Sequence, residues 1–81
     1  MTLEKCYLEC AEMKLKMTDS EGNFKTLTNK IKGFKVNILR IYPMIKDENQ
    51  DNYVVGFQLE HETTKELKEC DLLTLESYYE I

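Results

Sequence analysis

Apolar and polar positions alternate over much of this chain, a pattern typical of half-buried β-strands. The clearest alternation lies between residues 53 and 60, where large apolar side chains take every second position. They are Tyr53, Val55, Phe57 and Leu59. Because successive side chains of a strand point to opposite faces, this segment is predicted to be a strand with one buried face.

An earlier strand is predicted over residues 34–42, directly after Gly33, on its content of β-branched side chains. Its buried parity is expected to be Val36, Ile38, the stem of Arg40, and Tyr42. Pro43 has no amide hydrogen, so it is expected to end the strand or to place it at a sheet edge. The polar residues 46–52 are predicted to form the loop to the next strand.

The last third of the chain is divided into short segments. Residues 61–64 are predicted to be a turn and residues 65–69 a return strand. Residues 70–73 have the pattern of a single helical turn, and residues 74–76 are predicted to be a closing strand.

The N-terminal third allows more than one interpretation. Residues 11–17 alternate strictly, and residues 19–23 are turn formers that include Gly22, so a hairpin with residues 24–28 as the return strand is predicted. Residues 3–10 can continue that strand, which is the preferred interpretation. They can also form a helix capped by Thr2, since apolar residues recur at helical spacing: Leu3, Cys6, Tyr7, Cys10 and Ala11.

The predicted fold is mainly β, a small curled antiparallel sheet or a five-stranded barrel with an N-terminal hairpin, or with a short N-terminal helix in its place. An 81-residue chain is one small domain, here residues 1–81, with a hairpin element over 1–30 and a barrel-like core over 33–76. Period-two alternation predicts that six residues are buried together: Val36, Ile38, Val55, Phe57, Leu59 and Leu75.

Residues 33–76 resemble small barrels of the Tudor, KOW and Sm type in their hydrophobic pattern. The segment opens with a Gly-x-x-Val strand at Gly33, continues with a long polar loop, and has Gly56 in the second strand. It ends in a helical turn before a short last strand at residues 74–76. The resemblance implies a fold and leaves the function open.

Charge is sorted along the chain. The first 46 residues carry nine cations and five acids, a net charge of +4, whereas residues 47–81 carry two cations and ten acids, a net charge of −8. Such asymmetry indicates charged partners. In the basic part, cations lie beside an aromatic side chain, a combination that suits nucleic-acid binding. The cations would contact phosphates and Phe34 would stack on a base. The candidate residues are Lys30, Lys32, Phe34, Lys35 and Arg40.

In the acidic part, the predicted 46–52 loop carries three carboxylates that could dock on a basic protein surface, namely Asp47, Glu48 and Asp51. A protein partner is preferred over nucleic acid, because the net charge of −4 repels a polyanion. For each charged region, the simplest interpretation is that its side chains are only solvated and keep the protein from associating.

Candidate chemistry is sparse. Cys6, Cys10, Cys70 and His61 are zinc-donor types without the familiar zinc spacing, so no metal or other cofactor is predicted. His61 beside two glutamates invites a general-base role, but no nucleophile accompanies it in the sequence. The chain is therefore predicted not to be an enzyme.

The start of the sequence has no signal-peptide pattern, no segment is apolar enough to span a membrane, and three cysteines are an odd number. Cytoplasmic location with free thiols is the corresponding expectation. Heavy use of Lys, Glu, Asn and Ile suggests an AT-rich bacterial or phage genome. The predicted function is a small protein-binding module, such as a phage or mobile-element regulator or inhibitor of a host protein, with nucleic-acid binding as the alternative.

Overall fold

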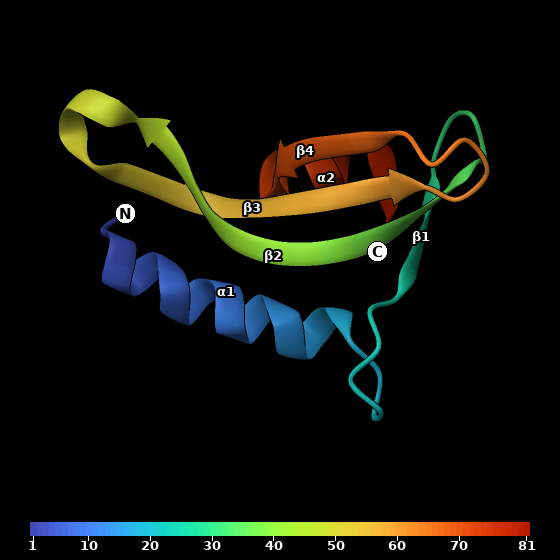
Figure 1. Ribbon diagram of the computed structural model, residues 1–81, viewed down its shortest axis with the longest axis horizontal. Coiled ribbons are helices and arrows are strands. Elements are labelled where there is room, and N and C mark those ends of the chain that lie inside the picture. Colours follow the sequence, from blue (N-terminus) through green and yellow to red (C-terminus); the bar gives the residue numbers. More distant parts are fainter.

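A computed structural model describes residues 1–81, apart from the side chain of Gln50. The elements in chain order are helix α1 (Leu3–Met17), strands β1 (Thr26–Asn29) and β2 (Lys35–Asp47), a 3₁₀ turn (Glu48–Gln50), strands β3 (Asn52–His61) and β4 (Leu67–Asp71), helix α2 (Leu72–Tyr78) and strand β5 (Tyr79–Glu80). All strand pairs are antiparallel, in the order β4-β3-β2-β1-β5. Figure 1 shows the curled sheet with α1 packed along it and α2 near β4.

The predicted mainly β fold is confirmed, and the sheet is not closed into a barrel. Strands β4 and β5 form its two edges, and α2 is the connection between them. No helix of the described chain has the length and apolar character needed to cross a membrane.

The predicted strand over residues 11–17 is wrong, and so is the preferred interpretation of residues 3–10 as its continuation, because both segments form helix α1. The alternative, a helix after Thr2, is confirmed. The hydroxyl oxygen of Thr2 accepts a hydrogen bond from the amide of Lys5, with a donor–acceptor distance of 3.3 Å. Basic residues follow in the last turn, where they suit the helix dipole. The apolar residues that contact the sheet recur at helical spacing: Cys6, Cys10, Met13 and Met17.

The hairpin expected at the N-terminus is therefore also absent from the described chain. Residues 18 and 24 form only an isolated bridge after α1. The segment predicted as the return strand, 24–28, overlaps β1, which pairs with β2 and β5 instead.

The predicted core is confirmed. All six residues named from the sequence are at most 5% exposed, and Phe57 and Leu75 are completely buried. Helix α1 adds Cys6, Cys10 and Met17, and β1 and β5 add Leu27 and Tyr79. Both helices thus pack against the face of the sheet that carries the core.

The prediction of which β2 side chains point to the buried face is wrong beyond Ile38. The register with β3 shifts between Ile38 and Arg40, so that Leu39 is an extra residue in β2. After this bulge Ile41 lies opposite Phe57 and packs against the core. Tyr42 lies opposite Gly56 on the other face.

Pro43 does not end β2, which continues to Asp47. The alternative expectation, a position at a sheet edge, is met, because β1 pairs only with the segment around Val36. Beyond that segment β2 has a strand neighbour on one side only, and such edge positions tolerate proline.

The two last predicted segments are shifted. Strand β4 begins at Leu67, because the turn before it includes Lys65 with a positive φ of 65°. Residues 74–76 belong to α2, and the closing strand is the two-residue β5. The side chain of Asp71 caps α2 by accepting a 2.9 Å hydrogen bond from the amide of Thr74.

Gly56 is needed for the close packing of β2 on β3. A Cβ atom at this position would lie 2.8 Å from the Cβ of Met44 and 3.2 Å from the carbonyl oxygen of Tyr42. We expect Gly56→Ala to lower the free energy of unfolding by about 1–3 kcal/mol, because a Cβ–Cβ clash cannot be relieved by rotating a side chain. Urea denaturation measures this loss. Gln58→Ala, on the same strand face, is the matched control, and an equal loss there would contradict the clash.

Candidate binding site

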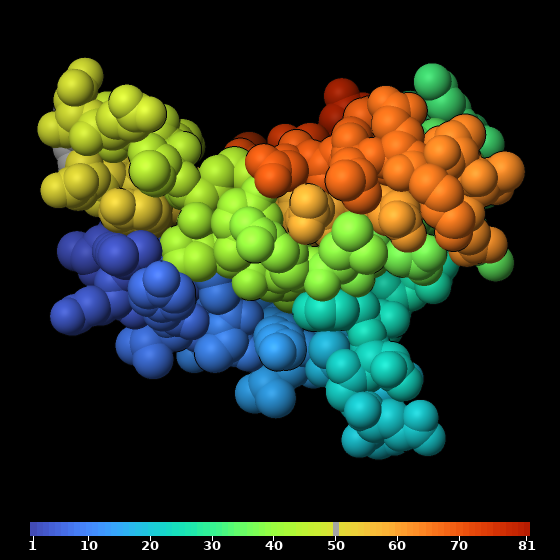
Figure 2. Space-filling model, in the orientation of Figure 1, coloured from blue at the N-terminus to red at the C-terminus, as the bar shows by residue number. Residues whose placement is uncertain are grey.

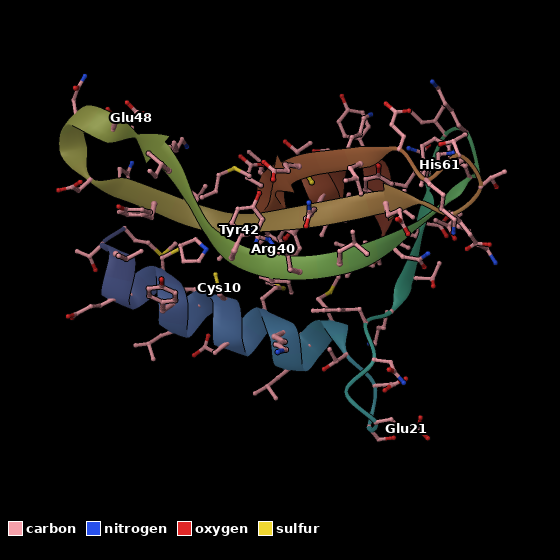
Figure 3. The ribbon with its side chains drawn as sticks, in the orientation of Figure 1. Cys10, Glu21, Arg40, Tyr42, Glu48 and His61 are labelled. Carbon is pink, nitrogen blue, oxygen red and sulfur yellow. The ribbon has the colours of Figure 1, made fainter. Side chains whose placement is uncertain are left out.

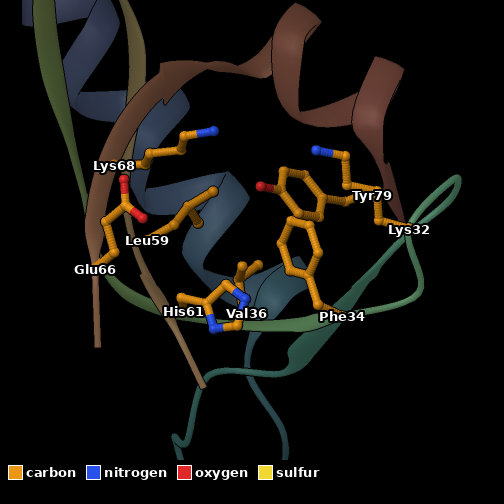
Figure 4. Close-up of a pocket in the computed structure, with 8 residues that line it drawn as sticks. All are labelled: Lys32, Phe34, Val36, Leu59, His61, Glu66, Lys68 and Tyr79. Atoms are coloured by element: carbon orange, nitrogen blue, oxygen red, sulfur yellow. The ribbon is translucent and has the colours of Figure 1, made fainter. Parts of the chain in front are cut away.

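Two adjoining cavities lie on the core-bearing side of the sheet near the connection from β1 to β2. Their volumes are about 180 and 400 Å³. Five residues line both cavities, and we call the shared space the basic pocket: Lys32, Phe34, Leu59, Lys68 and Tyr79. Because these residues come from the β1–β2 connection and from β3, β4 and β5, only the folded sheet forms the pocket (Figure 4).

Lys32 reaches the pocket because the β1–β2 turn is tightly fixed. The Asn29 side chain, only 8% exposed, accepts hydrogen bonds from the amides of Ile31 and Lys32, at 3.0 and 2.7 Å. Gly33 follows with φ of 77°, a value that glycine adopts without steric cost. The Asn and Gly of this turn therefore position the lysine.

Aromatic side chains form one wall of the pocket. The ring of Phe34 stacks on that of His61 with a centroid distance of 4.7 Å, and meets the ring of Tyr79 edge-on at 6.5 Å. His61 is held by its Nδ1 atom, which accepts hydrogen bonds from the amides of Thr63 and Thr64, both at 3.2 Å. The neutral ring therefore carries its hydrogen on Nε2.

Three hydrogen-bond donors point into the pocket. The ammonium groups of Lys32 and Lys68 extend toward each other, and the hydroxyl group of Tyr79 lies between them (Figure 4). Among the described side chains, neither ammonium has a carboxylate within 4.0 Å. Tyr79 as a whole is 5% exposed, and its hydroxyl faces the cavity that both lysines line. Lys32 and Lys68 are exposed residues, so an anion from solvent can reach both ammonium groups together with the Tyr79 hydroxyl.

The protonation state of Tyr79 favours this chemistry. Burial, and to a smaller extent the neighbouring Cys70, raise the pKa of the Tyr79 hydroxyl. It therefore stays a donor at neutral pH. Two carboxylates oppose an anion: Glu66 lines the smaller cavity and Glu69 lines the larger one.

The structure divides the basic residues predicted to contact nucleic acid. Lys32 and Phe34 line the pocket. Lys30 instead donates a 2.7 Å hydrogen bond from its Nζ to the carbonyl oxygen of Glu76 in α2. Lys35 is exposed beside Thr28, and Arg40 covers the ring of Tyr42 at 4.3 Å on the opposite face of the sheet. The cations of residues 25–46 therefore do not form one basic face.

The three predicted acidic contact residues do lie together, at the tip of the β2–β3 hairpin. The side chain of Asp47 accepts a 3.1 Å hydrogen bond from the amide of Asn49, and Asp51 has a left-handed backbone with φ of 47°. Figure 2 shows this tip, in yellow, projecting beyond the body of the molecule. Glu48 and His61 are at opposite ends of the sheet in Figure 3, so the tip and the basic pocket are separate surfaces.

The candidate zinc donors are spread over the molecule. Cys6 and Cys10 are buried in α1, Cys70 is in β4, and His61 belongs to the pocket wall. Within the described residues, no three His, Cys, Asp or Glu side chains are placed to hold a metal ion. Burial raises the pKa of the Cys10 and Cys70 thiols to about 11. Both stay protonated at neutral pH and are therefore poor nucleophiles and ligands.

Sequence reasoning missed Lys68 and Tyr79 as members of the site and assigned His61 to a surface turn. Each of these three residues lies at least 27 positions after Phe34 in the sequence. The local signal available was the Asn-x-x-x-Gly turn around Lys32, which identifies one side of the pocket only.

No protein family, curated protein or solved structure matches this chain significantly.

Proposed function

We propose that this chain is a small, non-enzymatic binding module for a protein partner, and that the partner places an anionic group in the basic pocket. The observation that carries this proposal is the convergence of three donors on one pocket, the ammonium groups of Lys32 and Lys68 and the hydroxyl of Tyr79. Charge-assisted hydrogen bonds to an anion are about twice as strong as neutral ones, so they fix a partner's position well.

The distribution of charge favours a protein over a nucleic acid. Residues 47–81 carry a net charge of −8, and Glu66 and Glu69 each line one of the two cavities. A polyanion would meet these carboxylates along its whole backbone, whereas a protein can offer one anionic group together with cations that complement the acidic surface.

The pocket's role is tested by charge reversal. We expect Lys32→Glu with Lys68→Glu to abolish capture of the partner from a lysate of the source cells, because two attractive charges become repulsive. Lys14→Glu with Lys16→Glu, on exposed positions of α1, changes the net charge equally and is the matched control. Quantitative mass spectrometry of both captures measures the effect, and equal loss or equal retention in the two variants would refute the pocket's role.

The hairpin tip is proposed as the second contact of the same partner. Because exposed charges act mainly on association, we expect Glu48→Lys with Asp51→Asn to slow association several-fold at low salt, with little effect at high salt. Asp47 is left intact because it caps the turn. Glu21→Lys, in the exposed turn after α1, is the control. Association rates that do not depend on the tip at low salt would remove it from the interface.

Nucleic acid remains the second candidate, favoured by the presence of both Lys32 and Phe34 in the pocket. If it were the ligand, affinity would fall with salt in proportion to the phosphates neutralised. Our proposal predicts no micromolar binding of single-stranded DNA or RNA near physiological salt. Such binding, lost in Lys32→Glu but kept in Lys35→Glu on the opposite side, would favour nucleic acid instead.

The proposal also includes a cellular location, a family resemblance and a kind of partner. Free thiols at Cys6, Cys10 and Cys70 agree with a reducing, cytoplasmic location. The resemblance of residues 33–76 to Tudor, KOW and Sm barrels stays a proposal that rests on the hydrophobic pattern of the sequence. The small size of the chain and its division into a basic and an acidic part support the proposal that it is a phage or mobile-element regulator or inhibitor of a host protein.

A further inference from the structure

The charges and donors of the basic pocket suit a doubly charged ligand. Lys32 and Lys68 bring two positive charges, and each ammonium has three N–H donors, to which Tyr79 adds one O–H donor. A carboxylate offers two oxygens and one negative charge. A phosphoryl group offers three acceptor oxygens and a charge of about −1.5 to −2 at neutral pH, which matches the lysine pair more closely.

The rest of the pocket suits a flat apolar ring. Phe34 and His61 form a stacked pair, Tyr79 meets Phe34 edge-on, and the side chains of Leu59 and Val36 complete the lining. Phe34, Leu59 and Tyr79 line both cavities, whereas His61 and Val36 line only the smaller one, of about 180 Å³. The adjoining larger cavity, about 400 Å³, falls within the range of small-ligand pockets, about 300–1,000 Å³. A phosphoryl group alone would leave the aromatic wall without a contact.

From these two features we infer that the basic pocket binds a phosphoryl group carried on an aromatic ring, the chemistry of a phosphotyrosine side chain in the protein partner. The inference rests on the proposed function, because it names the anionic group that the partner presents. The phosphoryl oxygens contact the two ammonium groups and the Tyr79 hydroxyl, and the ring packs on the wall formed by Phe34.

Glu66 gives this inference a direct electrostatic test. Its carboxylate lines the pocket beside Lys68 and repels the ligand (Figure 4). Removing one negative charge acts twice as strongly on a dianion as on a monoanion at the same position. Glu66→Gln is therefore expected to raise affinity for an aryl phosphate by more than it raises affinity for an aryl carboxylate.

The experiment is a titration of the isotope-labelled protein followed by NMR, with phenyl phosphate, inorganic phosphate, benzoate and uridine 5′-monophosphate as probes. We expect phenyl phosphate to shift the amide signals of Lys32, Phe34, Lys68 and Tyr79, and to bind about tenfold more tightly than inorganic phosphate because of the buried ring. Benzoate binding as tightly as phenyl phosphate would overturn the phosphoryl assignment, and tighter binding of the nucleotide would overturn the aryl one. Equal binding of inorganic phosphate would show an ion site without ring recognition.

Two tyrosine variants separate the pocket from general effects on the protein. Tyr79→Phe keeps the buried ring and removes only the hydroxyl donor, so it is expected to weaken phenyl phosphate binding about tenfold while circular dichroism stays unchanged. Tyr7→Phe, on an exposed position of α1, is the control and is expected to have no effect. Unchanged affinity in Tyr79→Phe would remove this hydroxyl from the site.

Failure of this inference differs from failure of the proposed function. If Lys32→Glu with Lys68→Glu abolishes capture of the partner but phenyl phosphate binds no better than benzoate, the pocket recognises a carboxylate and only the phosphoryl assignment is wrong. If the partner is captured equally by wild type and by this variant, the proposed function is wrong, whatever phenyl phosphate does. A final comparison of one tyrosine peptide, phosphorylated and unphosphorylated, then links the small probe to the protein ligand.

Discussion

Phe57→Ala is expected to lower the free energy of unfolding by about 3–5 kcal/mol, the usual cost of removing a buried aromatic side chain. Phe57 is completely buried at the centre of β3, opposite Ile41 of β2 and Cys70 of β4. A domain of this size has a total stability of about 5–10 kcal/mol, so the variant should be close to unfolding at ambient temperature. Urea denaturation followed by circular dichroism measures the change.

The control for this variant is Leu15→Ala, on α1, because Leu15 is 79% exposed. Its effect is expected to stay within about 0.5 kcal/mol. Equal stability of Phe57→Ala and wild type would mean that β3 does not carry the core. Equal, large losses in both variants would mean that the outer side of α1 is also buried in solution.

Leu75→Ala is expected to cost about 2–5 kcal/mol, since Leu75 is completely buried and is the one buried residue of α2. Helix α2 has only seven residues, too few for stability without packing. Loss of its anchor should loosen the following strand, β5, and with it Tyr79. We therefore expect faster hydrogen exchange at the amides of α2 and β5 than at those of β3.

Leu73→Ala is the matched control on the same helix, because Leu73 is 75% exposed. Both changes alter helix propensity equally, so the difference between them reports packing alone. If residues 73–76 were extended instead, residues 73 and 75 would share one face and the two variants would have similar effects. A large difference supports the helix.

The N-terminal helix shows where the sequence pattern is ambiguous. Alternation over residues 11–17 and helical spacing over residues 3–10 predict different elements for adjoining segments. The folded chain resolves the conflict by packing Cys6, Cys10 and Met17 against β2 and β3. Leu15, which the strand interpretation places on the buried face, is exposed because a helix turns it away.

The bulge in β2 shows a second limit. Alternation assigned Tyr42 to the same face as Val36 and Ile38, because the sequence carries no signal for the extra residue at Leu39. In strands without such an insertion, alternation was sufficient, and Val55, Phe57 and Leu59 are buried as expected. Alternation thus predicts the buried face of a strand only up to the first β-bulge, since one additional residue moves every later side chain to the opposite face.

For this protein, the sequence by itself determined the mainly β fold class and the five core residues of β2 and β3, because a strand that buries one face has an apolar side chain at every second position. Leu75 is buried as predicted, but in a helix and not in the predicted strand. It also placed Lys32 and Phe34 among candidate contact residues, through their local mixture of cation and aromatic ring. Only the tertiary structure decided that Lys35 and Arg40 lie apart from them, and that Lys68 and Tyr79 join them around one pocket. The physical reason is that strand order and register bring together β1, β3, β4 and β5, and no local pattern encodes which distant strands become neighbours.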